Sequence, residues 1–215
     1  MRIVGSSYQG HRDFGYYADG VIGSTSAAQL ILPEQPSRSS LFLQNTSSHV
    51  LWVGFGSARA TATLTGAIVT AVAVTNAGFG FSRAPIVTFF GGGIFPQQGQ
   101  YPANTSYIGA GGPSFPAPNH PAQAHCVMTG SAPNMTVASI TVDDGGNGYV
   151  IAPYVLISND ILDPNGCFDP SASSGSGFQL AAGQSIYENE SVVVTDAISA
   201  FCATLSATFA CRYTP

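Results

Sequence analysis

The chain has 215 residues, of which 45% are hydrophobic and only 8% charged. Its net charge is −5, and it contains no lysine. This length can bury a substantial core in one or two compact domains. The absence of a basic run argues against nucleic-acid binding through phosphates, and no apolar stretch reaches the roughly 20 residues that span a bilayer. Because so few charges on a free monomer promote association, the composition favours an assembly component covered by partners.

Residues 1–36 are rich in glycine and aromatic residues without a clear period. The first five residues contain no apolar core long enough for a secretory signal peptide, so synthesis in a host cytoplasm is expected. A segment of this kind cannot bury itself and orders on a partner. We therefore predict an extended N-terminal arm over residues 1–36. Its expected partner-binding anchors are Tyr8, Phe14, Tyr16 and Tyr17.

Residues 37–57 alternate apolar and polar side chains around a Thr-Ser-Ser turn at 46–48, which predicts a β-hairpin. The expected buried face consists of Leu41, Leu43, Leu51, Val53 and Phe55. Trp52 has the opposite parity and should be half-exposed. It is a further candidate for partner binding, although packing in a second sheet explains the same position equally well.

Residues 58–157 contain one β-rich unit written twice. The second halves align at an offset of 68, so that Val69 corresponds to Val137 and Pro85 to Pro153. The first halves align at 64, and a four-residue insertion around 131–134 accounts for the difference. Since so small a unit cannot bury its own apolar face, the copies are expected to pack on each other or on a neighbouring subunit.

Each copy reads as a strand, a glycine-rich elbow and a second strand, and we interpret it as a β-hairpin module. The elbow glycines supply positive φ, the following aromatic residue folds over the turn, and a proline starts the second strand. The predicted structural turn residues are Gly78, Gly80 and Pro85 in the first copy and Gly146, Gly148 and Pro153 in the second. The duplicated module is assigned to residues 58–160, with a long loop at 91–121 and a connecting loop at 161–177.

The C-terminal segment alternates from Phe201 to Tyr213, which predicts one long strand. On one such strand, Cys202 and Cys211 would face opposite sides and would not pair. Residues 37–57 and 178–215 are each too short for a core. We therefore predict an all-β fold, in which these segments form a discontinuous, jelly-roll-like β-sandwich with the repeat pair inserted in it.

Several short segments resemble structural proteins of tailed bacteriophages. Residues 38–48 (Arg-Ser-Ser-Leu-Phe-Leu-Gln-Asn-Thr-Ser-Ser) with 51–56 (Leu-Trp-Val-Gly-Phe-Gly) resemble the opening of their small β-sandwich proteins. Residues 178–185 (Phe-Gln-Leu-Ala-Ala-Gly-Gln-Ser) are similar to the turn before their closing strands. The elbow units resemble modules inserted in decoration, fibre and tail proteins. Phe79 departs from the small or polar residue usual in that turn, so the first elbow is expected to pack against another segment.

The resemblance covers roughly residues 38–215 and implies a virion structural role with no catalytic residues to transfer. The favoured function is a capsid decoration or cement protein that binds the head exterior as a homo-oligomer, such as a trimer. Its expected partners are the major capsid protein and copies of itself, with no nucleic acid, membrane or cofactor. The alternative is a tail, neck or fibre component with a glycan-binding face. An enzyme is disfavoured because no paired-acid motif is present.

Metal sites are weakly indicated. Asp160, Asp163 and Asp169 offer oxygen ligands without the spacing of an EF-hand loop, and turn formation explains them better than calcium. His120, His125 and Cys126 lack a second pair of ligands at zinc spacing. The four cysteines have no Cys-x-x-Cys spacing, and a reducing compartment predicts free thiols. We therefore expect no metal.

Overall fold

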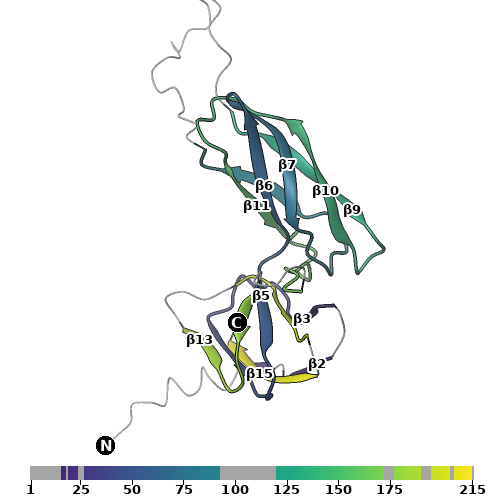
Figure 1. The fold of residues 1–215 in the computed structure, drawn as a ribbon, viewed down its shortest axis with the longest axis vertical. Helices are drawn as coiled ribbons and strands as arrows, with labels where there is room; N and C mark the ends of the chain where they lie inside the picture. Colours follow the sequence, from purple (N-terminus) through teal and green to yellow (C-terminus); the bar gives the residue numbers. More distant parts are fainter. Residues whose placement is uncertain are drawn as a thin grey trace, which may run out of the picture.

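The computed structural model describes residues 16–17, 19–23, 27–92, 120–171, 177–189, 195–203 and 206–214. These residues form antiparallel strands and turns, which confirms the all-β prediction. No helix among them is long and apolar enough to cross a membrane. Figure 1 shows two β units stacked end to end, a sandwich below and an inserted sheet above.

The lower unit consists of a five-stranded and a four-stranded sheet. The five-stranded sheet contains β1 (Tyr16–Tyr17), β2 (Gly20–Ile22), β4 (Ser40–Asn45), β13 (Ser185–Asn189) and β15 (Ala207–Thr214). The four-stranded sheet has the order β12 (Phe178–Leu180), β5 (Leu51–Phe55), β14 (Ile198–Phe201) and β3 (Gln29–Leu32). Segments 37–57 and 178–215 thus supply six of the strands, as the discontinuous arrangement requires.

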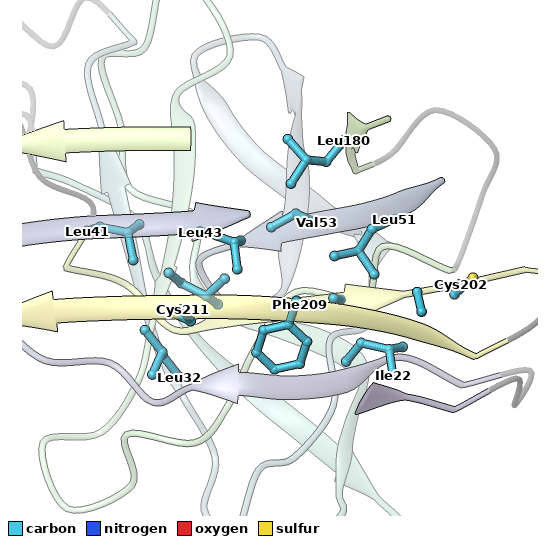
Figure 2. Packing of buried hydrophobic residues seen from close by; sticks show 13 residues of the cluster. Ile22, Leu32, Leu41, Leu43, Leu51, Val53, Leu180, Cys202, Phe209 and Cys211 are labelled. Carbon is cyan, nitrogen blue, oxygen red and sulfur yellow. The ribbon is translucent and has the colours of Figure 1, made fainter. Parts of the chain in front are cut away.

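Apolar side chains from both sheets fill the space between them, as Figure 2 shows. Leu41 and Leu43 on β4 meet Leu51 and Val53 on β5, and all four are fully buried. From β2 to β5 and again from β12 to β15, each successive strand lies in the opposite sheet. This alternation is the pattern of a jelly roll. Almost every connection therefore passes over an end of the core from one sheet to the other.

The predicted hairpin over residues 37–57 is wrong, because β4 and β5 lie in opposite sheets and do not pair. The turn between them is organised by Asn45, which is fully buried. Its Nδ2 donates to the carbonyls of His49 and Leu180, and its Oδ1 accepts from the backbone N–H of Ser47. A hairpin and an arch across a core both require alternating apolar residues, so the pattern alone could not separate them. Trp52 is half-buried, as predicted.

The single long strand predicted from Phe201 to Tyr213 is also wrong. It is divided into β14 and β15, which belong to different sheets. The inward parity changes between Cys202 and Ala207, both of which are fully buried, because the chain crosses from one sheet to the other. Cys202 and Cys211 therefore face the same core rather than opposite sides, and both are free thiols.

The predicted arm over residues 1–36 is corrected for its second half. β1 and β2 pair with β15, and β3 pairs with β14. Ile22 and Leu32 are each 2% exposed and belong to the sandwich core, so this segment buries itself after all. Short strands with few apolar residues gave too weak an alternation to be recognised. Residues 1–15, with the predicted anchors Tyr8 and Phe14, lie outside the described residues.

The insert leaves the sandwich after β5 and returns at β12, two strands that pair with each other. Its six strands occur in the order β10, β9, β8, β11, β6, β7, and β7 and β10 approach closely enough to make the sheet a nearly closed barrel. The first copy contributes β6 (Arg59–Thr65), β7 (Ile68–Asn76) and β8 (Ile86–Phe90), and the second contributes β9 (Gln123–Thr129), β10 (Thr136–Asp144) and β11 (Tyr154–Ser158).

This strand order reads the same from either edge once the copies are exchanged. The third strand of each copy pairs with the first strand of the other, β8 with β9 and β11 with β6. The backbone contacts repeat accordingly. Val69 N–H donates to Gly145, as Val137 does to Ala77, at 2.9 and 3.0 Å. The predicted packing of the copies on each other is therefore present, in the form of a pseudo-twofold exchange of strands.

The elbow glycines all have positive φ, between 60° and 82°, as predicted. Phe81 and Tyr149 fold inward and are nearly fully buried. The interpretation of each elbow as the turn of a hairpin is wrong, however, because the strands on either side of it do not pair. The elbow instead carries the chain across to the other copy. Pro85 and Pro153 are buried immediately before β8 and β11.

Comparing two glycines with similar φ distinguishes the cost of backbone strain from the cost of overpacking. Gly66 has a φ of 64° and open space where a Cβ would lie, whereas at Gly78, with a φ of 60°, a Cβ would lie 2.8 Å from the Cys167 carbonyl oxygen. Gly66→Ala should destabilise the protein by about 1–2 kcal/mol through strain alone. Gly78→Ala should cost about 1–3 kcal/mol more through overpacking. Chemical denaturation measures both, and equal losses would contradict the packing of the first elbow.

Candidate functional site

The segment 159–171 lies between the two β units and joins them. Phe168 is 1% exposed, and its backbone carbonyl accepts a 2.5 Å hydrogen bond from Ser199 Oγ of the sandwich. Its backbone N–H donates to Gly56, and the guanidinium of Arg59 lies 4.3 Å from its ring centre. A side chain at Gly54 would collide with the same ring, so the approach of Phe168 to β5 requires glycine there.

The first elbow is bound to this joining segment. Phe79 and Cys167 exchange two backbone hydrogen bonds of 2.9 Å, so the first elbow packs against another segment, as expected. The carboxylate of Asp163 accepts from the backbone N–H groups of Ser82 and Arg83. The first elbow therefore anchors the insert to the sandwich.

A groove lies beside this junction, with a volume of about 460 Å³. We call it the junction groove. Its acidic and basic lining residues are Glu34 and Asp196 from the sandwich and Arg59 from β6. Tyr154 and Leu156 on β11 form an apolar wall, and Asn159 adds an amide. A groove of this size, with two aromatic side chains and several polar ones, can hold a small polar ligand such as a sugar.

The ionisation of Glu34 is shifted by this setting. Burial raises the pKa of Glu34 above its ordinary value of 4.5, and the negative charge of Asp196 acts in the same direction. A hydrogen bond with Asn159 opposes both effects. Glu34 therefore keeps its proton to higher pH than a free glutamate.

A second candidate surface is the outer face of the insert, which we define as the outward side chains of β8 and β11. They are Ile86, Thr88, Phe90, Tyr154, Leu156 and Ser158. Strands of this sheet bury their other side in the insert core, for example through Phe89 and Val155. The outer face carries no ionisable carboxylate, histidine, lysine or arginine, and its four large apolar side chains are exposed. It can bind an apolar surface of another protein.

The sequence-predicted anchors are not brought together by the structure. Tyr16 and Tyr17 lie in β1 at an edge of the sandwich, and Trp52 lies on β5 in the other sheet. Their role in partner binding remains a prediction. Glu34, Arg59 and Asp196 were missed because they are far apart in the sequence and share no motif. The outer face had a visible signal, since the runs Ile86–Phe90 and Tyr154–Ser158 are apolar at successive positions, as strands with two apolar faces are.

The predicted acidic cluster is dispersed into turns. Asp160 accepts from the Leu162 N–H and Asp169 from the Ser171 N–H, while Asp163 binds the first elbow. Within the part of the chain that the structure describes, no three histidine, cysteine or acidic side chains are arranged for a metal.

The histidines and cysteines likewise serve separate local contacts. His125 pairs with Asp143 at 2.8 Å on the surface, whereas Cys126 points into the insert core. Burial raises the pKa of Cys126 to about 11 and that of Cys211 to about 12. Thiols with such pKa values are protonated at neutral pH and are poor nucleophiles.

Comparisons of the chain with protein-family models, curated protein sequences and solved structures find no match. The candidate sites therefore rest on geometry and chemistry alone.

The raised pKa of Glu34 predicts a pH-dependent stability. Because the folded state binds this proton more tightly, the free energy of unfolding should fall as the pH rises from about 4.5 through the folded pKa. Glu34→Gln removes the titration and should be more stable than the parent at about pH 7 but equal to it below about pH 4. Urea denaturation across this range measures the difference. A difference that did not change with pH would contradict the assignment.

Neither chelation nor reduction should change the stability of the fold. The four cysteines are buried free thiols, Asp160 and Asp169 accept hydrogen bonds within turns, and Asp163 binds the first elbow. We expect EDTA and DTT each to shift the melting temperature by less than about 2 °C, because structural metals and disulfides contribute several kcal/mol. A large fall with EDTA would restore the calcium interpretation of Asp160, Asp163 and Asp169.

Proposed function

We propose that this chain is a non-enzymatic structural protein of a tailed-bacteriophage virion, a capsid decoration or cement protein. In this role it binds the head exterior as an oligomer and stabilises the contacts between capsomers. Its partners are the major capsid protein and further copies of itself.

The observation that carries this proposal is the outer face of the insert. Exposed apolar patches on this scale mark surfaces that bind proteins or membranes. The sandwich supports the insert through the contacts of Phe168 with Ser199 and Gly56. Low charge over the whole chain is in keeping with a surface that is covered after assembly.

The phage-like segments also have consistent places in the fold. Residues 38–56 form the arch from β4 to β5, and residues 178–185 form the turn from β12 to β13. Both are framework elements that define the sandwich. They support a structural role, since framework resemblance concerns architecture rather than activity.

The alternative is a tail, neck or fibre component that binds a glycan, and the junction groove favours it. Carboxylates and an amide accept and donate hydrogen bonds to sugar hydroxyl groups, and Tyr154 offers an aromatic surface. Copy number in purified virions separates the two roles, because a decoration protein occurs in hundreds of copies and a tail component in few. Antibody labelling of heads or of tails gives the location directly.

The N-terminal residues provide a direct test of attachment. Because β1 begins at Tyr16, deletion of residues 2–15 should leave the sandwich folded, whereas deletion of residues 2–20 removes a strand and part of β2. If residues 2–15 carry the anchors Tyr8 and Phe14, the shorter deletion should abolish incorporation without lowering the melting temperature. Particles from a mutant lacking the protein would be incubated with either form, pelleted and quantified. Equal occupancy by the deletion variant would exclude the arm as an attachment element, and labelling confined to tails would favour the alternative.

A further inference from the structure

The outer face has an internal pseudo-twofold symmetry. β8 and β11 are equivalent strands of the two copies, and they pair at the centre of the six-stranded sheet. Thr88 pairs with Leu156, its own equivalent at the offset of 68, so the pseudo-twofold axis passes between these two residues. Ile86 and Tyr154 are likewise equivalent, and each copy thus directs one large apolar side chain outward at the same position.

The extent of this face is appropriate for protein association. Tyr154 is 68% exposed, Ile86 54%, Phe90 51% and Leu156 38%. The two aromatic side chains alone leave on the order of 200 Å² open to solvent. Val127 on the adjacent β9, two positions beyond the His125 that pairs with Ile86, is a further exposed apolar residue. Together these residues approach the roughly 300–600 Å² typical of functional patches, and the outward side chains of β6 and β9 would extend a contact toward the roughly 800 Å² per partner of a stable interface.

The chemistry of the face restricts its partner. None of its outward side chains is charged, so a partner that placed a charge there would leave it buried without a counter-ion, at a high energetic cost. Beside this face, Thr61 next to Tyr154 is neutral. The charged groups at its margins already have partners, because His125 opposite Ile86 pairs with Asp143 and Arg59 lies over the ring of Phe168. A second copy of the same face is apolar, neutral and approximately twofold-symmetric, and it satisfies this requirement without further assumptions.

We infer that two copies of this chain associate through the outer faces of their inserts, sheet against sheet, in an isologous contact. The edges of the insert do not compete as association sites, because β7 and β10 approach each other and nearly close the sheet. Each residue of an isologous contact occurs twice in the interface, so one substitution changes two places at once. The inference deepens the self-association in the proposed function, but it stands on the face alone and does not require a virion.

Analytical ultracentrifugation of the full-length protein over a range of concentrations tests the inference. The parent should show a concentration-dependent dimer. Tyr154→Arg should weaken association at least tenfold, because it replaces two aromatic rings in the interface with two charged side chains. Leu162→Arg is the matched control, since Leu162 is 69% exposed but lies on the joining segment, away from the outer face. It should associate like the parent. Thr88→Arg, at the pseudo-twofold axis, provides a second disruption if the first variant has a reduced melting temperature.

The outcomes are distinct. A parent that stays monomeric up to about 100 µM, well above the roughly micromolar range of a standard interface, would overturn the inference. Equal weakening by Tyr154→Arg and Leu162→Arg would do the same, because it would indicate non-specific association. If a monomeric parent bound particles and Tyr154→Arg did not, the face would belong to another virion protein, and the proposed function would survive without this inference. A dimer disrupted by Tyr154→Arg that bound no part of a virion would support the inference and contradict the function.

Discussion

The exchange of third strands between the two repeats is the constraint on which the insert depends. A three-stranded copy has an apolar face it cannot cover, but β8 lies between the strands of the second copy and β11 lies beside those of the first. Phe81 and Tyr149 connect the copies further. The Phe81 N–H donates to the carbonyl of Met135, just before β10, and the Tyr149 N–H donates to that of Ala67, just before β7. Neither copy has a complete core alone, and the pair should fold as one cooperative unit.

The two elbows show how a duplicated unit acquired different tasks. At the first elbow, Phe79 bonds to Cys167 and the N–H groups of Ser82 and Arg83 are held by Asp163, which ties the insert to the sandwich. At the equivalent place in the second elbow, Asn147 bonds to His120 within the insert itself. The same backbone geometry is therefore an attachment point in one copy and a closed turn in the other. One segment, 159–171, makes the difference.

Much of the fold was accessible from the sequence because period-2 alternation and glycine placement are local properties. The duplication, the positive φ of Gly78 and Gly146 and the discontinuous sandwich all follow from such signals. What failed was the pairing of strands. Alternation indicates that a strand has an apolar face. It does not indicate whether the next strand pairs with it in the same sheet or packs opposite it across the core. The choice at residues 46–50 depends on the buried Asn45, whose partner Leu180 is 135 positions away. The junction groove escaped prediction for the same reason, because Glu34 and Asp196 meet only through the fold.

The composition and the architecture lead to one physical conclusion. An insert strand such as β11 carries Val155 and Ile157 on its inner side, which the barrel core requires, and Tyr154 and Leu156 on its outer side, which that core does not require. Retaining large apolar residues on an exposed face costs solubility unless another surface covers them. The sandwich has no comparable row on a central strand among its described residues, where exposed apolar side chains such as Val21 and Phe178 lie on short strands. The proposed association would therefore involve the insert, with the sandwich as the framework that positions it.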